Sequence, residues 1–159
     1  MEVEGIIGAF MVIHRELWQR LGGMDEDFFL YYEENDFFCR ARKAGATVRW
    51  SPRIRVLHQR GGSTSQVNLR SKVEFYRSQD CFNRKHLPPL HYWAFQTTQI
   101  AGLIFNTGGN LLLCGLTLGL HKKTRSRLRW YSHVLGWRFR GSPAGWGLIK
   151  IRDDKTGKD

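Results

Sequence analysis

The sequence predicts an α/β front half followed by a helical, basic back half. Two observations support this. Short apolar, β-branched runs alternate with short helical patterns over residues 1–64, and residues 87–120 contain no Asp, Glu, Lys or Arg. A chain of 159 residues with 42% hydrophobic content can hold one domain plus an appendage, and is too apolar for wholesale disorder.

Three segments of the front half are predicted to be strands. Residues 5–13 are apolar and β-branched, with small residues at Gly8 and Ala9, which is typical of a buried strand. Residues 46–50 and 54–57 are shorter runs of the same kind. Together they predict a small sheet.

Three helices are predicted around these strands. Residues 14–21 form a short helix that ends at Gly22-Gly23. Residues 33–43 form a second helix with acids in the first turn and bases in the last, an order that complements the helix dipole. Residues 67–85 form a third, longer helix with a polar face.

The uncharged stretch 87–120 is flanked by basic residues on both sides. It is long enough for a transmembrane helix, but residues 106–110 (Asn-Thr-Gly-Gly-Asn) predict a break into two shorter helices. Positive charge at both ends favours a re-entrant or interfacial hairpin at the cytoplasmic side of a membrane. A soluble hairpin packed on the front half is the alternative.

The net charge of +11 comes entirely from residues 65–159, because residues 1–64 carry nine Lys/Arg and nine Asp/Glu. The basic residues are interleaved with the uncharged stretch and do not line one groove, which argues against a nucleic-acid partner. An anionic membrane surface fits this distribution better.

The three cysteines are odd in number and include no C-x-x-C pair. This argues against a disulfide framework and a structural zinc site, and fits a reducing compartment. The acidic N-terminus has no signal-peptide pattern. We therefore expect a cytoplasmic protein at the inner face of the cell membrane.

Three carboxylates stand at the start of the predicted helix 33–43, directly after aromatic residues. Glu33 and Asp36 share one face, and Asp36 is spaced to pair with Arg40 one turn on. Glu34 points away from both, and an unpaired carboxylate near aromatic side chains suits a general base. Acids also favour a helix N-terminus by electrostatics alone, so a structural role stays open.

His58 follows a predicted strand and precedes a loop that contains Gly61, Gly62, Ser63 and Thr64. The backbone and hydroxyl groups of such a loop can approach a phosphate or a metal ion. A histidine at a strand end is more often structural, so this motif is weak on its own.

In combination these features resemble family 2 glycosyltransferases, above all their bacterial rhamnosyltransferase-like branch. The resemblance is dense over residues 5–64. It rests on Gly8-Ala9, Arg15-Glu16, the turn at residues 21–29, Tyr32 to Asp36 with Arg40, and His58 with Gly61 to Thr64.

The resemblance implies the acceptor-side half of an A-type glycosyltransferase fold, followed by a helical extension. It assigns Glu34 as the catalytic base, supported by Glu33 and Asp36, although the family usually has Asp where Glu34 stands. Substrate-binding residues would be Gly8, Ala9, Arg40, Gly62, Ser63 and Thr64. His58 would bind a Mg²⁺ or Mn²⁺ ion.

The implied activity is inverting sugar transfer from a nucleotide-diphospho-sugar to a glycan or lipid-linked acceptor, in cell-surface polysaccharide synthesis. The nucleotide-binding half with its Asp-x-Asp motif would lie before Met1, so this chain alone would be inactive. The implied domains are a catalytic segment (1–64), a connecting helix (65–86), a basic, membrane-associated extension (87–149) and a disordered tail (150–159).

Two rival interpretations belong to other functional classes. A membrane-binding fragment that has lost catalysis shares every feature of residues 65–159 with the glycosyltransferase interpretation. A basic nucleic-acid-binding protein is the weaker rival, and a steep salt dependence of DNA or RNA binding would favour it.

Overall fold

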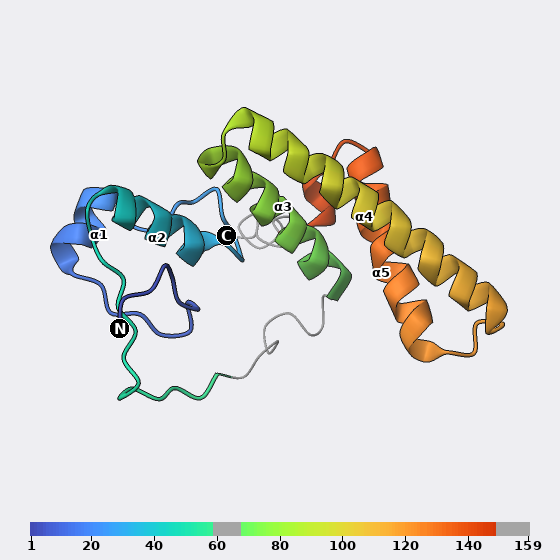
Figure 1. The fold of residues 1–159 in the computed structure, drawn as a ribbon, viewed down its shortest axis with the longest axis horizontal. Helices are drawn as coiled ribbons and strands as arrows, with labels where there is room; N and C mark the ends of the chain where they lie inside the picture. Colours follow the sequence, from blue (N-terminus) through green and yellow to red (C-terminus); the bar gives the residue numbers. More distant parts are fainter. Residues whose placement is uncertain (59–67, 149–159) are drawn as a thin grey trace, which may run out of the picture.

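The structure, a computed structural model, describes residues 1–58 and 68–148 (Figure 1). Five α-helices and one short 3₁₀ helix make up its regular structure. They are α1 (Arg15–Leu21), α2 (Glu33–Lys43), α3 (Asn68–His86), α4 (Pro89–Leu116), α5 (Lys122–Phe139) and η2 (Ala144–Trp146). In Figure 1, α1 and α2 lie at one end, α4 and α5 at the other, and α3 connects the two groups.

The predicted α/β architecture is wrong for the described residues, which contain helices but no strand. The partial A-type glycosyltransferase fold is therefore not supported. The β pairing there is one isolated antiparallel bridge between Glu2 and Arg49. Beside it, the Val3 backbone N–H donates to the Val48 carbonyl at 3.0 Å.

The predicted strands fail for a physical reason. A β-branched run becomes a strand only where a neighbouring strand accepts its backbone hydrogen bonds. Residues 5–13 and 54–57 have no such neighbour among the described residues, and residues 46–50 meet residues 1–3 at the isolated bridge alone. Several of their large side chains, including Ile7, Val12 and Leu57, are exposed, so the predicted burial of 5–13 is also wrong.

The predicted helices of the front half are confirmed. Helix α1 ends at Leu21 and is capped by Gly22, which adopts the left-handed conformation with φ +72°. Helix α2 spans the predicted residues, with three acids in its first turn and three basic residues in its last. Helix α3 begins at Asn68 and ends one residue beyond the prediction, at His86.

The predicted break at residues 106–110 is wrong, because α4 continues through them as one helix. The polar side chains bond to their own helix. Asn106 and Asn110 donate to the carbonyls of Gly102 and Asn106, and Thr107 donates to the carbonyl of Leu103. These local bonds satisfy the polar groups without a turn. The hairpin is instead formed by α4 and α5, which turn between Thr117 and His121.

Two hydrophobic clusters hold the helices. The first is built from Phe37, Phe38 and Ala41 of α2 with Val48. The second joins Val73 of α3, Leu103 of α4, and Val134 and Trp137 of α5. The second cluster fixes the three long helices against one another.

Helix α4 is, by length and composition alone, capable of crossing a membrane. Only 6% of its most apolar 18-residue window is buried. A core helix of a soluble domain would bury much more of such a window, so the surface of α4 is unusual for a packed helix.

Candidate functional site

The candidate site lies at the N-terminal end of α2, where Glu33, Glu34 and Asp36 stand in the first turn. The residues before the helix, Tyr31 and Tyr32, both have φ of +67°. This region is uncommon for a residue with a bulky side chain, and its use at two successive positions indicates a tightly defined loop.

Aromatic packing against α3 holds this loop. The Tyr32 ring lies 5.6 Å from the Phe75 ring and 5.3 Å from the Phe82 ring, measured between centroids. Gln79 donates a hydrogen bond to the Tyr32 hydroxyl at 2.8 Å, and Ser78 donates to the Leu30 carbonyl at 2.7 Å. The start of α2 is thus fixed by residues more than forty positions away.

Asp36 is buried, with 1% of its surface exposed. Its Oδ2 accepts a hydrogen bond from Arg40 Nε at 2.6 Å, which confirms the predicted pairing one turn apart. Its Oδ1 lies 2.7 Å from His86 Nε2, at the end of α3. Both carboxylate oxygens are therefore occupied, and the placement favours a positioning role for Asp36 over contact with a substrate.

The Arg40 guanidinium is engaged in the same network. It donates to the Leu21 carbonyl at 2.8 Å and to the Gly23 carbonyl at 2.9 Å, in addition to Asp36. Gly23 has φ +76°, and a Cβ there would lie 3.0 Å from the Trp18 ring. Arg40 joins the end of α1 and the following turn to α2, so its placement also favours positioning over the substrate binding that we predicted from the sequence.

Lys85 of α3 neutralises the acids of the preceding turn. Its Nζ lies 2.5 Å from Asp25 Oδ2 and 2.7 Å from Asp27 Oδ2. Burial alone would raise the pKa of Asp25, but the hydrogen bonds from Lys85 and the Asp27 backbone N–H, together with the charges of Lys85 and Arg40, outweigh it, so this pKa is lowered. Burial would lower the pKa of Lys85, but the hydrogen bonds to both aspartates hold it well above its usual range.

Glu34 differs from these acids. Within the described part of the chain the Glu34 side chain forms no hydrogen bond and no ion pair, and the residue is partly exposed. Gly8 lies directly beside it, since a Cβ on Gly8 would lie 3.4 Å from the Glu34 Cβ and 3.7 Å from its Cδ. The structure therefore brings together Glu34 and Gly8, two of the predicted site residues.

Glu33 is less accessible. Its Oε2 is buried without a hydrogen-bond partner in this structure. Burial raises the pKa of the Glu33 carboxyl, its own backbone N–H lowers it in part, and the charge of Glu34 raises it further. Both glutamates are therefore partly buried, and they differ in that one carboxylate oxygen of Glu33 is enclosed whereas neither oxygen of Glu34 is.

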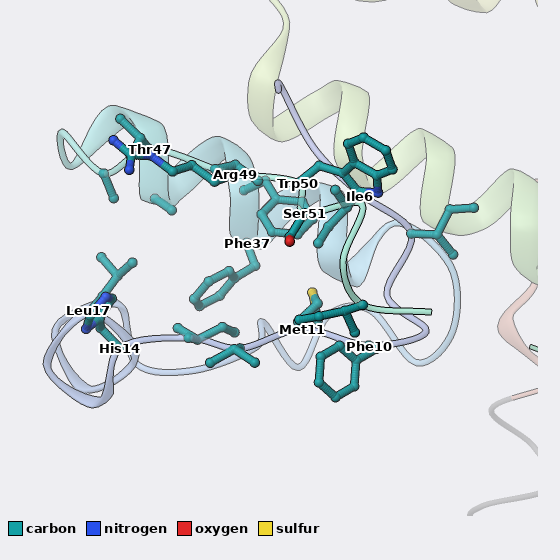
Figure 2. A pocket seen from close by; sticks show the side chains of 18 of the residues that line it. Ile6, Phe10, Met11, His14, Leu17, Phe37, Thr47, Arg49, Trp50 and Ser51 are labelled. Atoms are coloured by element: carbon teal, nitrogen blue, oxygen red, sulfur yellow. The ribbon is translucent and has the colours of Figure 1, made fainter. Parts of the chain in front are cut away.

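A mostly apolar pocket of about 450 Å³ lies between residues 6–14, residues 46–56 and helix α2 (Figure 2). Figure 2 shows the Phe37 ring pointing into the space between Met11 and the backbone segment of Thr47 to Ser51. Ala9 lines the pocket, but neither Glu33 nor Glu34 does. Its lining is mostly apolar, and the titratable side chains that it includes are those of His14 and Arg49.

The remaining predicted residues add nothing to the Glu34 region within the described part of the chain. His58 is exposed at the end of the first described segment. Gly62, Ser63 and Thr64 lie outside the described residues. Across residues 1–58 and 68–148, no three His, Cys, Asp or Glu side chains gather into a potential metal site. The residues described here therefore do not by themselves fit the predicted Mg²⁺ or Mn²⁺ ion.

Sequence reasoning missed the roles of Lys85 and His86. Both act on carboxylates at least fifty residues earlier in the chain. The available signal was their position in the last turn of a predicted helix, after an acidic front half, but this signal does not identify the partner.

Comparisons with known proteins give two partial similarities. The low-salt glycan biosynthesis hexosyltransferase Agl10 of Haloferax volcanii is 29% identical over 83 residues, which is 48% of this chain and 27% of the relative. The N-acetylglucosaminyl-diphospho-decaprenol L-rhamnosyltransferase of Mycobacterium tuberculosis is 34% identical over 59 residues, 37% of this chain and 19% of the relative. No protein-family model and no solved structure matches.

The chain therefore spans about a quarter or less of the length of these curated relatives. The names of both relatives describe sugar transferases. The similarity, which covers only part of this chain, suggests a relation to glycosyltransferases.

Proposed function

We propose that this chain supplies the acceptor side of a glycosyltransferase, as part of a longer enzyme, and that Glu34 is its general base. The observation that carries the proposal is the partial similarity to a hexosyltransferase and a rhamnosyltransferase. The small share of each relative that is covered supports the view that other parts of the enzyme bind the nucleotide-diphospho-sugar donor.

The surroundings of the carboxylates support Glu34 over its neighbours. Asp36 is buried between Arg40 and His86, and Asp25 and Asp27 are paired with Lys85. Glu33 is half-buried beside the aromatic loop. A base must reach its substrate with a free oxygen, and among these carboxylates Glu34 meets this requirement best.

In the proposed reaction an acceptor hydroxyl donates its proton to Glu34 while the hydroxyl oxygen attacks the anomeric carbon of the donor sugar. The bond from that carbon to the nucleoside diphosphate breaks in the same step, which inverts the configuration. Gly8 lies directly beside the Glu34 side chain in this arrangement. The described residues offer no built metal site, so no step is assigned to a metal ion.

The proposed acceptor is a glycan or a lipid-linked sugar, in cell-surface polysaccharide synthesis. The name of the mycobacterial relative specifies a diphospho-decaprenol substrate, which supports the lipid-linked form. Our proposed location is the cytoplasmic face of the cell membrane, where such an acceptor and a soluble nucleotide-sugar meet.

The test is sugar transfer by the complete enzyme that carries this chain. Glu34→Gln should lower turnover by about 10²-fold or more. Glu26→Gln is the matched control, because Glu26 is an exposed acid of the preceding turn, and it should keep turnover within about twofold. Near-normal turnover of a folded Glu34→Gln enzyme would remove Glu34 from the mechanism.

A further inference from the structure

The far end of the α4–α5 hairpin carries a cluster of exposed leucines, which we name the hairpin tip. In Figure 1 it lies at the opposite end of the molecule from α1 and α2. The exposed members are Leu111, Leu112, Leu113, Leu116, Leu118 and Leu120. Exposed apolar side chains are common singly, but six within ten residues form a patch of the kind that marks an interaction surface.

Packing among residues 1–58 and 68–148 does not account for these leucines. Helix α4 buries Gln96 and Leu103, and its last thirteen residues contain no buried side chain. The hydrophobic cluster with α3 takes its only α4 member from Leu103. The far end of the α4–α5 hairpin extends away from α3 (Figure 1).

The turn itself is apolar where turns are usually polar. Leu118 has φ +48° and is 85% exposed, and Leu120 is 80% exposed. Left-handed backbone favours Gly or Asn over a leucine. The chain therefore accepts a backbone cost and an exposed apolar side chain at the same position, which indicates that the leucine serves a contact outside the described residues.

Basic residues directly adjoin the hairpin tip. The first half of α5 presents five exposed basic side chains, namely Lys122, Lys123, Arg125, Arg127 and Arg129. No Asp or Glu occurs anywhere in residues 81–148. An apolar tip bordered by cations and free of acids matches the two layers of an anionic bilayer, with hydrocarbon below the negative headgroups.

The polar contacts of the first half of α4 decide how deep it can insert. Gln96 donates to Asp80 and to the Tyr92 hydroxyl, and Gln99 donates to Gln79 at 2.7 Å. Arg138 of α5 donates to Gln99 at 2.6 Å. A membrane-spanning α4 would have to break these bonds or carry the charged helix α3 into the hydrocarbon.

The part of α4 beyond its last buried residue is too short to span a bilayer. From Leu103 to Leu116 the helix rises about 20 Å at 1.5 Å per residue, while the hydrocarbon core is about 30 Å thick. The hairpin can therefore dip into one leaflet and cannot cross both.

We propose that the hairpin tip is a membrane-docking site that inserts its leucines into one leaflet of an anionic bilayer while the basic residues of early α5 contact lipid phosphates. This inference rests on the surface of the hairpin and is independent of the proposed sugar transfer.

The test is cosedimentation of the 159-residue chain with lipid vesicles. The chain should bind vesicles that contain phosphatidylglycerol, bind pure phosphatidylcholine vesicles more weakly, and be partly released by high salt. Leu118→Asn should weaken binding to both vesicle types by about tenfold or more, because apolar burial is lost. Asn also suits the φ of that position, so the variant should fold.

Charge variants separate the second contribution. The double variant Lys122→Gln, Lys123→Gln should weaken binding to phosphatidylglycerol vesicles by roughly 30-fold and leave binding to phosphatidylcholine vesicles nearly unchanged. The matched controls are Leu90→Asn, an exposed leucine at the other end of α4, and Arg53→Gln with Arg55→Gln, two exposed basic residues of the front half. All controls should bind as the parent chain does.

Three results would overturn the proposal. The first is no binding to either vesicle type. The second is anionic binding that Leu118→Asn leaves intact, which would mean charge attraction alone. The third is a concentration-dependent dimer in sedimentation that Leu118→Asn abolishes while vesicle binding stays absent, which would make the tip an interface between two copies of this chain.

Discussion

Arg40→Ala is expected to destabilise the front half of the molecule strongly. Removing the guanidinium leaves the Asp36 carboxylate, 1% exposed, with His86 as its remaining partner. It also removes the donor to the carbonyls of Leu21 and Gly23. One side chain therefore serves three acceptors from two helices and the turn between them.

The cost follows from burial. Breaking a buried ion pair by removing one partner costs about 3–5 kcal/mol. The Arg40 side chain is 24% exposed, so water can replace part of its hydrogen bonding, and we expect the lower end, about 3 kcal/mol. Because a domain has roughly 5–15 kcal/mol of total stability, the variant should fold but unfold at much lower urea concentration.

The assay is urea unfolding at neutral pH followed by far-ultraviolet circular dichroism, with Arg42→Ala as the control. Arg42 is exposed two residues further along the same helix, and its loss should change the free energy of unfolding by less than about 0.5 kcal/mol. Arg40→Lys should fall between the two, because one ammonium cannot reproduce the planar fork of donors. A change below about 0.5 kcal/mol for Arg40→Ala would refute the proposed network.

Two further predictions concern pH. Lys85→Met should lower the free energy of unfolding at neutral pH by about 1 kcal/mol or less, as expected for partly exposed ion pairs. Because the pKa of Asp25 is lowered in the folded state, this loss should fade as the pH falls below about 4. An equal loss in acid would contradict the ion pair between Lys85 and Asp25. Glu33→Gln should raise the melting temperature at neutral pH. Because the pKa of the Glu33 carboxyl is raised in the folded state, its ionisation at neutral pH opposes folding, and the gain should vanish in acid, where the carboxyl is protonated. A gain that is the same at both pH values would show that the charge of Glu33 is not responsible.

The helices were predictable because their signals are local. The glycine pair after α1 and the order of acids and bases along α2 fix both ends of those helices within a few residues. The pairing of Asp36 with Arg40 has the same character, since a spacing of four on a helix places two side chains together.

The strands were not predictable because pairing is not local. Residues 5–13 have the composition of a strand, but the described chain supplies no neighbouring strand to pair with them. The apparent break in α4 misled for a related reason, since the asparagines at 106 and 110 bond back to their own helix. Residue propensity describes the structure that a segment favours on its own, whereas the groups that bond to its backbone decide which structure it adopts.

The candidate site was predictable in part. Sequence reasoning gave the carboxylates at the start of α2, but the contacts that distinguish them come from His86 and Lys85, many residues away. Only the folded arrangement shows that Asp36 is enclosed and that the Glu34 side chain lies beside Gly8 without a hydrogen-bond or ion-pair partner among the described residues.

The most direct test of the central claim is a single-turnover comparison of Glu33→Gln and Glu34→Gln in the complete enzyme with donor sugar bound to saturation. Donor binding is measured separately by calorimetry. Our account predicts that Glu34→Gln slows the transfer step by about 10²-fold or more with donor affinity unchanged, while Glu33→Gln keeps the step within about tenfold. A transfer step that is slowed equally by both variants, or more by Glu33→Gln, would contradict the assignment of Glu34 as the base.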